Sequence, residues 1–257
     1  MPSTHDTAKI AYDATVKGAM EFFAKDLFTS QMTSEKREKI LSTLKHITGI
    51  RKKISPHQEK AKAAITKAHK TDAVVIASST GGPKALCQLF SGLAKNFPVP
   101  IILVQHNTSG FDKGFVQWLD GYTELNVLLA EEGMMPAAGN IYVAPTDRHL
   151  LIGSDGFSLD DGEPINSQKP AADLLFKSAA EFYGKALISV VLTGMGSDGA
   201  EGTRLVKQAG GITIAQDEAS SLIFGMPQAA IETGCVDMVI NLYNITTELI
   251  SLTKRMV

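Results

Sequence analysis

The sequence DAVVIASSTGG, residues 72–82, decides the fold, because an unbroken apolar run ends there in two serines, a threonine and two glycines. Its apolar part, residues 73–77, has no alternating polar positions, which is typical of a strand buried on both faces of a parallel sheet. Pro83 then begins an amphipathic run, and proline suits the first turn of a helix because no N–H donor is needed there. A strand, a tight turn and a helix place Ser79 or Thr80 at the carboxyl edge of a sheet, where open α/β sheets bind their ligands.

The whole chain has the composition of an ordinary globular protein. Its 257 residues are 44% hydrophobic and 20% charged, enough for one α/β domain with an appendage. The net charge of −2 argues against a general affinity for nucleic acid or a membrane surface. The first ten residues contain no apolar leader and no stretch reaches 18 apolar residues, so we expect a cytoplasmic protein without membrane insertion. Cys87 and Cys235 lie far apart without metal-binding spacing, which predicts buried thiols and neither a disulfide nor a zinc site.

The order of the patterns along the chain predicts two parts that divide near Thr71. Residues 1–71 are predicted to be a helical N-terminal segment with a Lys-rich linker, and residues 72–257 to form the functional domain. In the second part, apolar runs alternate with helical patterns in the order of a doubly wound, mainly parallel sheet. Residues 127–159 interrupt this order with four short runs separated by turn residues, which predict a small antiparallel insertion with hairpins. The predicted fold class is therefore α/β.

Three polar groups stand where predicted strands end. Ser79 follows the first strand of the domain, His106 follows the second, and Asp198 lies just past a third apolar strand at residues 188–192. If these strands are parallel, the three residues share one edge of the sheet. They are the inventory of a hydrolytic triad, because an imidazole activates a serine hydroxyl and a carboxylate holds that imidazole in the useful tautomer. Backbone amides of a glycine-rich turn can then bind the oxyanion that forms.

Each of these residues also has an ordinary interpretation. Ser79 could cap the following helix or belong to a phosphate-binding loop, His106 could be a loop histidine, and Asp198 could cap the helix that begins at Gly199. The nucleotide-loop patterns are absent around Ser79, and so is the Gly-x-Ser-x-Gly elbow of lipases. The joint occurrence of the three residues at three strand ends favours the triad.

Several runs of this sequence resemble one family closely, the catalytic domain of the chemotaxis response-regulator protein-glutamate methylesterase, CheB. The runs keep the family's order and cover most of residues 73–252: ASSTGG (77–82), QH (105–106) with GF (110–111), YVAPTDRH (142–149), KP (169–170) with DLLF (173–176), LTGMGSDGA (192–200), and AQDEAS (215–220) through FGMP (224–227). The resemblance implies Ser79 as nucleophile, His106 as general base and acid, and Asp198 as the group that orients it. It also implies Thr80 and the Met195 backbone near the developing oxyanion, and a reaction without metal or organic cofactor.

The chain departs from the family pattern in three places. Residues 107–109 replace the Met-Pro that commonly follows Gln-His, and Ser167, Gln168 and Lys169 stand where the family has arginines, which bind carboxylates differently from lysine. Upstream, residues 1–71 are too short for the receiver domain of family members. Residues 18–26 resemble the last strand of a receiver, with a free helical appendage as the alternative, and we expect no stable autonomous receiver.

The leading hypothesis is hydrolysis of glutamate methyl esters on chemoreceptors or related signalling proteins, in a two-component system, with glutamine deamidation at the same site. The partners that the resemblance implies are a methylated receptor and an input from a receiver domain or histidine kinase. The alternative is a regulatory module that docks to a partner on an esterase-like scaffold, because fold alone does not decide function. The altered residues 107–109 and 167–169 favour that alternative, and the intact Ser79, His106 and Asp198 oppose it.

Overall fold

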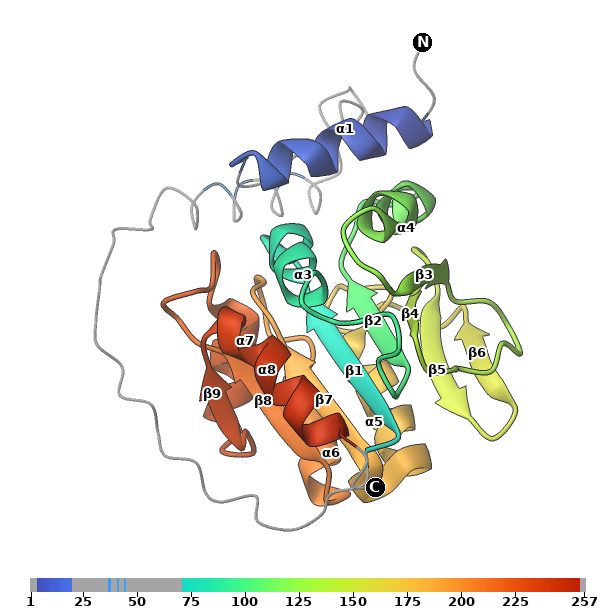
Figure 1. Ribbon diagram of the computed structural model, residues 1–257, viewed down its shortest axis with the longest axis vertical. Helices are drawn as coiled ribbons and strands as arrows, with labels where there is room; N and C mark the ends of the chain where they lie inside the picture. Colours follow the sequence, from blue (N-terminus) through green and yellow to red (C-terminus); the bar gives the residue numbers. More distant parts are fainter. Residues whose placement is uncertain (1–3, 20–36, 38–40, 42–43, 45–70, 255–257) are drawn as a thin grey trace.

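The computed structural model describes residues 4–19, 37, 41, 44 and 71–254. Within them, a seven-stranded, wholly parallel sheet forms the centre of the molecule (Figure 1). Its strands lie in the order β3 (Asn126–Leu129), β4 (Asn140–Val143), β2 (Ile101–Gln105), β1 (Ala73–Ser78), β7 (Leu187–Val191), β8 (Ile212–Gln216) and β9 (Met238–Ile240). The predicted doubly wound α/β class is confirmed.

The four central strands are buried along their whole length, as their apolar runs predict. Helices α3 (Gly82–Phe90), α4 (Asp112–Asp120) and α8 (Leu242–Thr253) pack against one face of the sheet. Helices α5 (Ala172–Tyr183), α6 (Ala200–Gln208) and α7 (Gly225–Glu232) pack against the other, and a 3₁₀ turn at Gly184–Ala186 connects α5 to β7. Successive residues of β1 alternate between the two apolar cores, because side chains of a strand point to opposite faces.

The insertion predicted at residues 127–159 is half as large as expected. Strands β5 (His149–Gly153) and β6 (Gly156–Asp160) form an antiparallel hairpin, which confirms that part of the prediction. Strands β3 and β4 instead extend the main sheet in parallel, so their assignment to the antiparallel insertion was wrong. The physical reason is that β3 is an edge strand, and the alternating exposure of its side chains is also the pattern of a hairpin strand.

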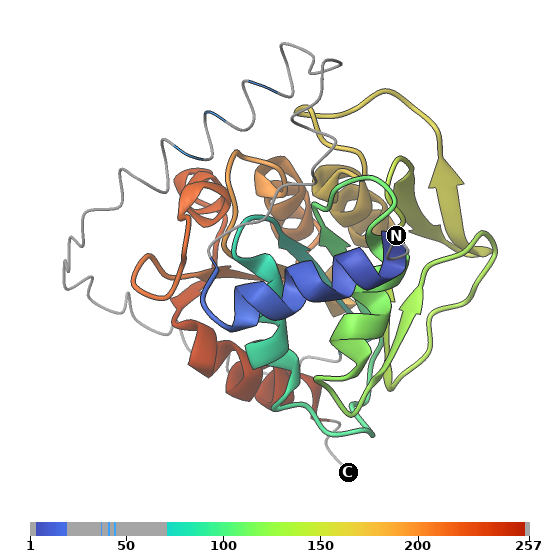
Figure 2. The ribbon, with the colours of Figure 1, turned by 90° about the horizontal axis from the view of Figure 1, so that it is seen from above.

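The N-terminal helix α1 (Thr4–Val16) lies across α3 and α4 (Figure 2). The Tyr12 ring is buried against the rings of Phe115 and Trp118, with centroids 5.1 Å apart in each pair. The Trp118 indole N–H donates to Asp13 Oδ1 at 3.0 Å. The predicted receiver-like strand and the predicted linker fall almost entirely on residues 20–36 and 45–70, outside the described residues, so the proposed division near residue 71 stays a prediction.

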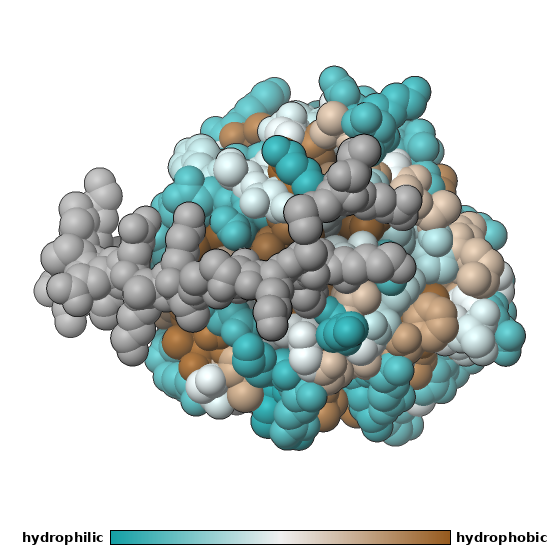
Figure 3. All heavy atoms as spheres, turned by 60° about the horizontal axis from the view of Figure 1, so that its bottom comes forward, coloured by the Kyte–Doolittle hydropathy of each residue, from teal (hydrophilic) through white to brown (hydrophobic). Residues whose placement is uncertain are grey.

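The described residues on one face of the molecule are mainly hydrophilic. Figure 3 shows hydrophilic residues spread over one face, with hydrophobic residues in small separate areas. Among the helices that the structure describes, each is too short or too polar to cross a membrane.

Candidate active site

The three predicted residues stand at the ends of three neighbouring strands. Strand β1 lies between β2 and β7 in the sheet, and all three run in the same direction. Ser79 directly follows β1, His106 directly follows β2, and Asp198 lies in the turn between β7 and α6. The structure therefore brings the three turns together at the carboxyl edge, as the pattern of strand ends predicts.

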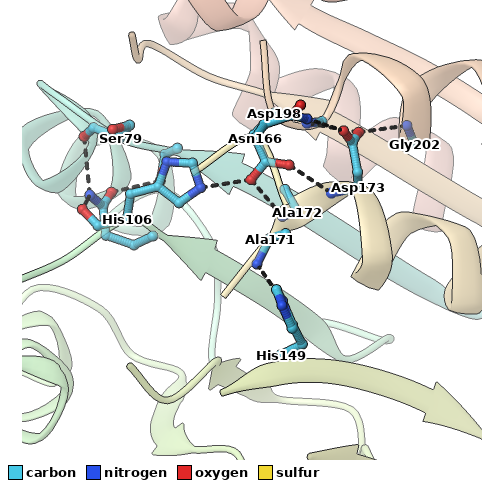
Figure 4. A network of polar contacts seen from close by, with 12 residues as sticks. Ser79, His106, His149, Asn166, Ala171, Ala172, Asp173, Asp198 and Gly202 are labelled. Atoms are coloured by element: carbon cyan, nitrogen blue, oxygen red, sulfur yellow. Dashed lines mark hydrogen bonds and ion pairs between the residues drawn. The ribbon is translucent and has the colours of Figure 1, made fainter. Parts of the chain in front are cut away.

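His106 and Asp198 make direct contact. His106 Nε2 lies 2.7 Å from Asp198 Oδ2, and the two side chains are only 4% and 2% exposed. A carboxylate accepts, so Nε2 carries the hydrogen and a neutral His106 has its lone pair on Nδ1. This Nδ1 is buried and has no hydrogen-bond partner among the described residues. In Figure 4 the imidazole lies between Ser79 and the Asp198 carboxylate. The ring can therefore accept a proton on Nδ1 while Asp198 holds Nε2.

Asp198 does not cap the helix that follows it. Its carboxylate accepts from the amides of Ala172 at 2.7 Å and Asp173 at 3.0 Å, which open helix α5. The N-cap of α6 is Gly199, whose φ of 92° suits glycine. The structure therefore contradicts the alternative in which Asp198 merely caps α6. The carboxylate instead lies at the positive end of the α5 dipole.

A second buried carboxylate, Asp173, lies beside the first. Its Oδ1 accepts from the amides of Gly199 at 2.9 Å and Gly202 at 2.7 Å, and its Oδ2 accepts from Asn166 Nδ2 at 3.1 Å. Burial raises the pKa of Asp173 from 3.8 to about 6, and the charge of Asp198 raises it as well, whereas the Gly202 and Gly199 amides lower it. Asp173 begins the run DLLF (173–176) that resembles the family, but the sequence alone predicted no role for it. Its place in the first turn of a predicted helix was the available signal.

Gln105 joins the serine turn to the histidine turn. Its Oε1 accepts from Ser78 Oγ at 2.7 Å, and its Nε2 donates to the carbonyl oxygens of Ser79 at 3.1 Å and His106 at 3.0 Å. The His106 amide also donates to the Ser78 carbonyl at 2.9 Å. One buried amide group thus fixes both backbones. The sequence did not predict this role. Gln105 ends an apolar strand, and its contact with the serine turn becomes apparent only when β1 and β2 are placed side by side.

Ser79 is not the cap of helix α3. The N-cap is Gly81, with φ of 80° and no side-chain cap. The Ser79 amide donates to the Thr193 carbonyl at 3.0 Å, which ties the turn to the end of β7, and its side chain is half-buried. Because His106 Nδ1 has no partner in the described part of the chain, the Ser79 hydroxyl does not donate to it in this conformation. Such hydrogen bonds are often formed only when substrate is bound.

Thr80 and Met195 flank the serine turn. Within the described residues, neither of their amide N–H groups donates to a protein acceptor. The Thr193 hydroxyl lies 3.0 Å from the Thr80 carbonyl oxygen and holds this turn in place. Gly194 lies so close to Ser79 that a Cβ atom there would be 2.8 Å from Ser79 Cβ. A glycine is required at that position.

The departures from the family pattern lie on loops beside the site. Ser109 contacts Asp147 Oδ2. Lys169 Nζ points to the carbonyl oxygens of Asp161 at 3.4 Å and Gly162 at 3.2 Å, beyond strand β6. Its ammonium is thus held by backbone in this conformation.

The described residues contain no cluster of three or more His, Cys, Asp or Glu side chains that could hold a metal ion. Both cysteines are free thiols, Cys87 buried and Cys235 only partly so. Burial raises the pKa of the Cys87 thiol to about 12, and the charge of Asp13 adds to this shift. Cys87 therefore stays protonated at neutral pH and is a poor nucleophile.

Comparison with known proteins gives consistent matches. Residues 74–249 match the family described as CheB methylesterase. The chain is 39% identical to protein-glutamate methylesterase/protein-glutamine glutaminase 2 of Anaeromyxobacter dehalogenans, over 98% of this chain and 74% of that protein. It is 38% identical to the protein-glutamate methylesterase/protein-glutamine glutaminase of Thermotoga maritima, over 97% of this chain and 74% of that protein. The crystal structure of the Thermotoga maritima CheB methylesterase catalytic domain superposes with a TM-score of 0.69 at 43% identity, over 71% of this chain and 99% of that one.

Proposed function

The chain belongs to the CheB methylesterase family, and from this premise we propose that Ser79, His106 and Asp198 are its catalytic triad. The enzyme is a hydrolase, a protein-glutamate methylesterase/protein-glutamine glutaminase. The observation that carries the residue assignment is the buried contact between His106 Nε2 and Asp198 Oδ2, with Nδ1 left without a partner in the described part of the chain.

In the acylation half of the proposed reaction, His106 Nδ1 takes the proton of Ser79 while Oγ attacks the carbonyl carbon of the glutamate methyl ester. The negative charge that develops on the carbonyl oxygen is stabilised by backbone amides, for which Thr80 and Met195 are the candidates because both N–H groups lack a protein acceptor within the described residues. The tetrahedral intermediate then expels methoxide, which takes the proton from His106 and leaves as methanol. An acyl group remains on Ser79.

In the deacylation half, a water molecule gives a proton to His106 Nδ1 and attacks the acyl carbon. The second tetrahedral intermediate collapses, Ser79 Oγ leaves and recovers its proton from His106, and the glutamic acid side chain is released and gives up its proton to water. Glutamine deamidation follows the same course, with ammonia leaving in place of methanol. Asp198 stabilises the imidazolium in both halves.

The imidazole is used in the opposite sense to that of the chymotrypsin template, in which Nδ1 binds the aspartate and Nε2 serves the serine. Here Nε2 is occupied by Asp198. Either nitrogen of a neutral imidazole can be the base as long as the other carries the hydrogen. The proposal therefore assigns Nδ1 to Ser79.

We infer a methylated chemoreceptor as the substrate, because the chain belongs to the CheB methylesterase family and its relatives are protein-glutamate methylesterases. The input that regulates the enzyme, a receiver domain or a histidine kinase, belongs to the same proposal.

Methanol release from a methylated receptor fragment tests the proposal. Ser79→Ala and His106→Ala should each lose about 10³-fold or more of kcat, because members of a triad act as a unit. Ser91→Ala is the control: its exposed hydroxyl lies at the far end of α3 and, in the described residues, donates its hydrogen bond to the Gln88 carbonyl oxygen, so activity should not change. Full activity of Ser79→Ala would refute the nucleophile assignment. Receptor binding without turnover by the unmodified protein would instead support the docking module.

A further inference from the structure

Two buried carboxylates at this site hold each other's helices. Asp198, which precedes α6, accepts from the first amides of α5, and Asp173, in the first turn of α5, accepts from the first amides of α6 (Figure 4). Asp198 is 2% exposed and Asp173 is 7% exposed. The arrangement is a reciprocal cap that joins two helices far apart in the sequence.

The four amide contacts are strong for their kind. They join N–H groups to carboxylate oxygens over 2.7 to 3.0 Å, the range of charge-assisted hydrogen bonds, at helix starts where the dipole favours negative charge. Each carboxylate thereby satisfies amides that have no partner within their own helix. Asp173 holds the turn between Asp198 and Gly202 from outside, in addition to the contacts within the turn that join Ala200 to Ser197 and Thr203 to Gly199.

One atom, Asp198 Oδ2, links the two caps to the proposed catalytic histidine. Asp198 Oδ2 is shared by His106 Nε2 and the Ala172 amide, each at 2.7 Å. The Asp173 carboxylate accepts a hydrogen bond from the amide of Gly199, the residue next to Asp198. A shift of that turn would change the direction of the Asp198 carboxylate and with it the orientation of the imidazole.

The start of α5 is itself anchored from the hairpin side. The Ala171 amide donates to His149 Nδ1 at 3.1 Å, and His149 Nε2 lies 3.0 Å from the Glu163 carbonyl oxygen. His149 is fully buried at the start of β5. Asp173 therefore projects from a fixed base, which lets its carboxylate hold the neighbouring turn.

We propose that Asp173 is a positioning residue of this enzyme: by accepting the Gly199 and Gly202 amides, it holds the turn that carries Asp198 in the conformation that orients His106. The proposal rests on the triad assigned above. Asp173 acts through Asp198 and does not touch the reacting groups. Its competitor is a role in stability alone, as any buried helix cap could have.

Three variants separate the two roles, measured by methanol release with kcat and KM determined separately. Asp173→Ala removes the acceptor and should lower kcat by about 30-fold to 100-fold with KM within about 3-fold, because misplacement of a catalytic group by about 1 Å can cost about 100-fold. Asp173→Asn keeps an oxygen that can accept both amides, while Asn166 can turn its own oxygen toward the new NH₂ group. It should retain kcat within about 5-fold.

Ser178→Ala is the matched control on the same helix. The Ser178 hydroxyl is buried, donates to the Leu175 carbonyl and accepts from the Ile152 amide, on the hairpin side of α5. Its loss should lower the melting temperature without lowering kcat. If Asp173→Ala, still folded, keeps kcat as Ser178→Ala does, Asp173 is only structural. If Asp173→Asn loses as much as Asp173→Ala, the hydrogen-bond geometry is not what matters and the proposal fails.

A second readout covers the case in which Asp173→Ala does not fold. Asp173→Ser suits a helix start but is too short to hold both amides, so it should show the same fall in kcat. The low-field proton resonance of His106 Nε2–H should be present in the unmodified enzyme and Ser178→Ala, and shifted or broadened in Asp173→Ser; an unchanged resonance would overturn the proposal. Absence of methanol release by the unmodified enzyme would refute the proposed function instead, so the two failures are distinguishable.

Discussion

The turn of Ser79 and the turn of Asp198 are held by groups of different kinds. On the serine side, the Gln105 amide and the Thr193 hydroxyl, both neutral, fix the backbone. On the carboxylate side, Asp173 does so with a charge. The difference follows from what must be held: a carboxamide can donate twice and so bridges two carbonyl oxygens, whereas helix starts offer amides and call for an acceptor. The nucleophile turn should therefore be insensitive to pH, and the Asp198 turn should not.

The largest effect is expected where the two turns meet, at Gly194. In Gly194→Ala the new Cβ would lie 2.8 Å from Ser79 Cβ and against Met226 Sδ. Met226 can move its flexible end, but Ser79 is fixed by its backbone, so we expect kcat to fall by about 100-fold or more. The measurement is methanol release at saturating substrate.

Gly153→Ala is the control for that experiment, because a Cβ at Gly153 meets no atom within 4 Å. Its activity should equal that of the unmodified enzyme. If Gly194→Ala were as active as Gly153→Ala, the serine turn would be able to accommodate an additional Cβ atom, contrary to the distances in the structure.

The next prediction concerns the serine turn, where a titratable carboxyl group replaces the neutral amide of Gln105. In Gln105→Glu a carboxylate would face the carbonyl oxygens of Ser79 and His106, and the two donated hydrogen bonds would be lost. We expect kcat to fall by about 10-fold to 100-fold at neutral pH and stability to fall by about 2–4 kcal/mol, with partial recovery at low pH when the carboxyl can donate. Urea unfolding and methanol release at several pH values measure both.

Gln88→Glu makes the same chemical change on α3, where the amide nitrogen has no hydrogen-bond partner among the described residues. Its activity should stay within about 2-fold. If Gln105→Glu were equally harmless, the amide bridge would have no part in holding the site.

The smallest effect concerns the charged side. Burial raises the pKa of Asp173 from an ordinary 3.8 to about 6 in the folded protein, and the neighbouring charges of Asp198 and Glu201 raise it as well. Between these two values the folded state binds more protons than the unfolded state, so stability falls as pH rises from about 4 to about 6 and stays lowered above that. Asp173→Asn removes this dependence, so its stability relative to the unmodified enzyme should rise by about 2–3 kcal/mol between pH 4 and pH 7.

Urea titrations at pH 4.5 and pH 7 provide the measurement. Ser178→Ala should differ from the unmodified enzyme by the same amount at both values, because a hydroxyl does not titrate there. A pH-independent difference for Asp173→Asn would mean that Asp173 is already ionised at pH 4.5.

The sequence predicted much of the site because three of its strands are buried along their whole length. Their apolar runs end sharply, and the residues after them are Ser79, His106 and, a turn later, Asp198. Contacts with distant elements could not be read in this way. Nothing local indicates that Asp198 receives amides from α5, or that Asp173 returns the contact to α6, because both depend on how two helices pack side by side.

Short strands were the weak point of the fold prediction. Strand β9 has only three residues and was not predicted from the sequence. In β3, buried and exposed side chains alternate as in an edge strand, and the same pattern is typical of a hairpin strand. In such strands the partner decides the pairing, and the local pattern carries little information about it. The central strands can be predicted from the sequence because each is an almost continuous apolar run.

Helix α1 gives the molecule a built-in optical reporter. Trp118 is the single tryptophan of the chain, so the whole indole emission comes from one ring that stacks beside Tyr12 and donates its N–H to Asp13. Undocking of α1 would expose the side of that indole that now faces Tyr12 and Asp13 to water and shift its fluorescence to longer wavelength. The position of the N-terminal helix can thus be followed in solution, during turnover, without any label.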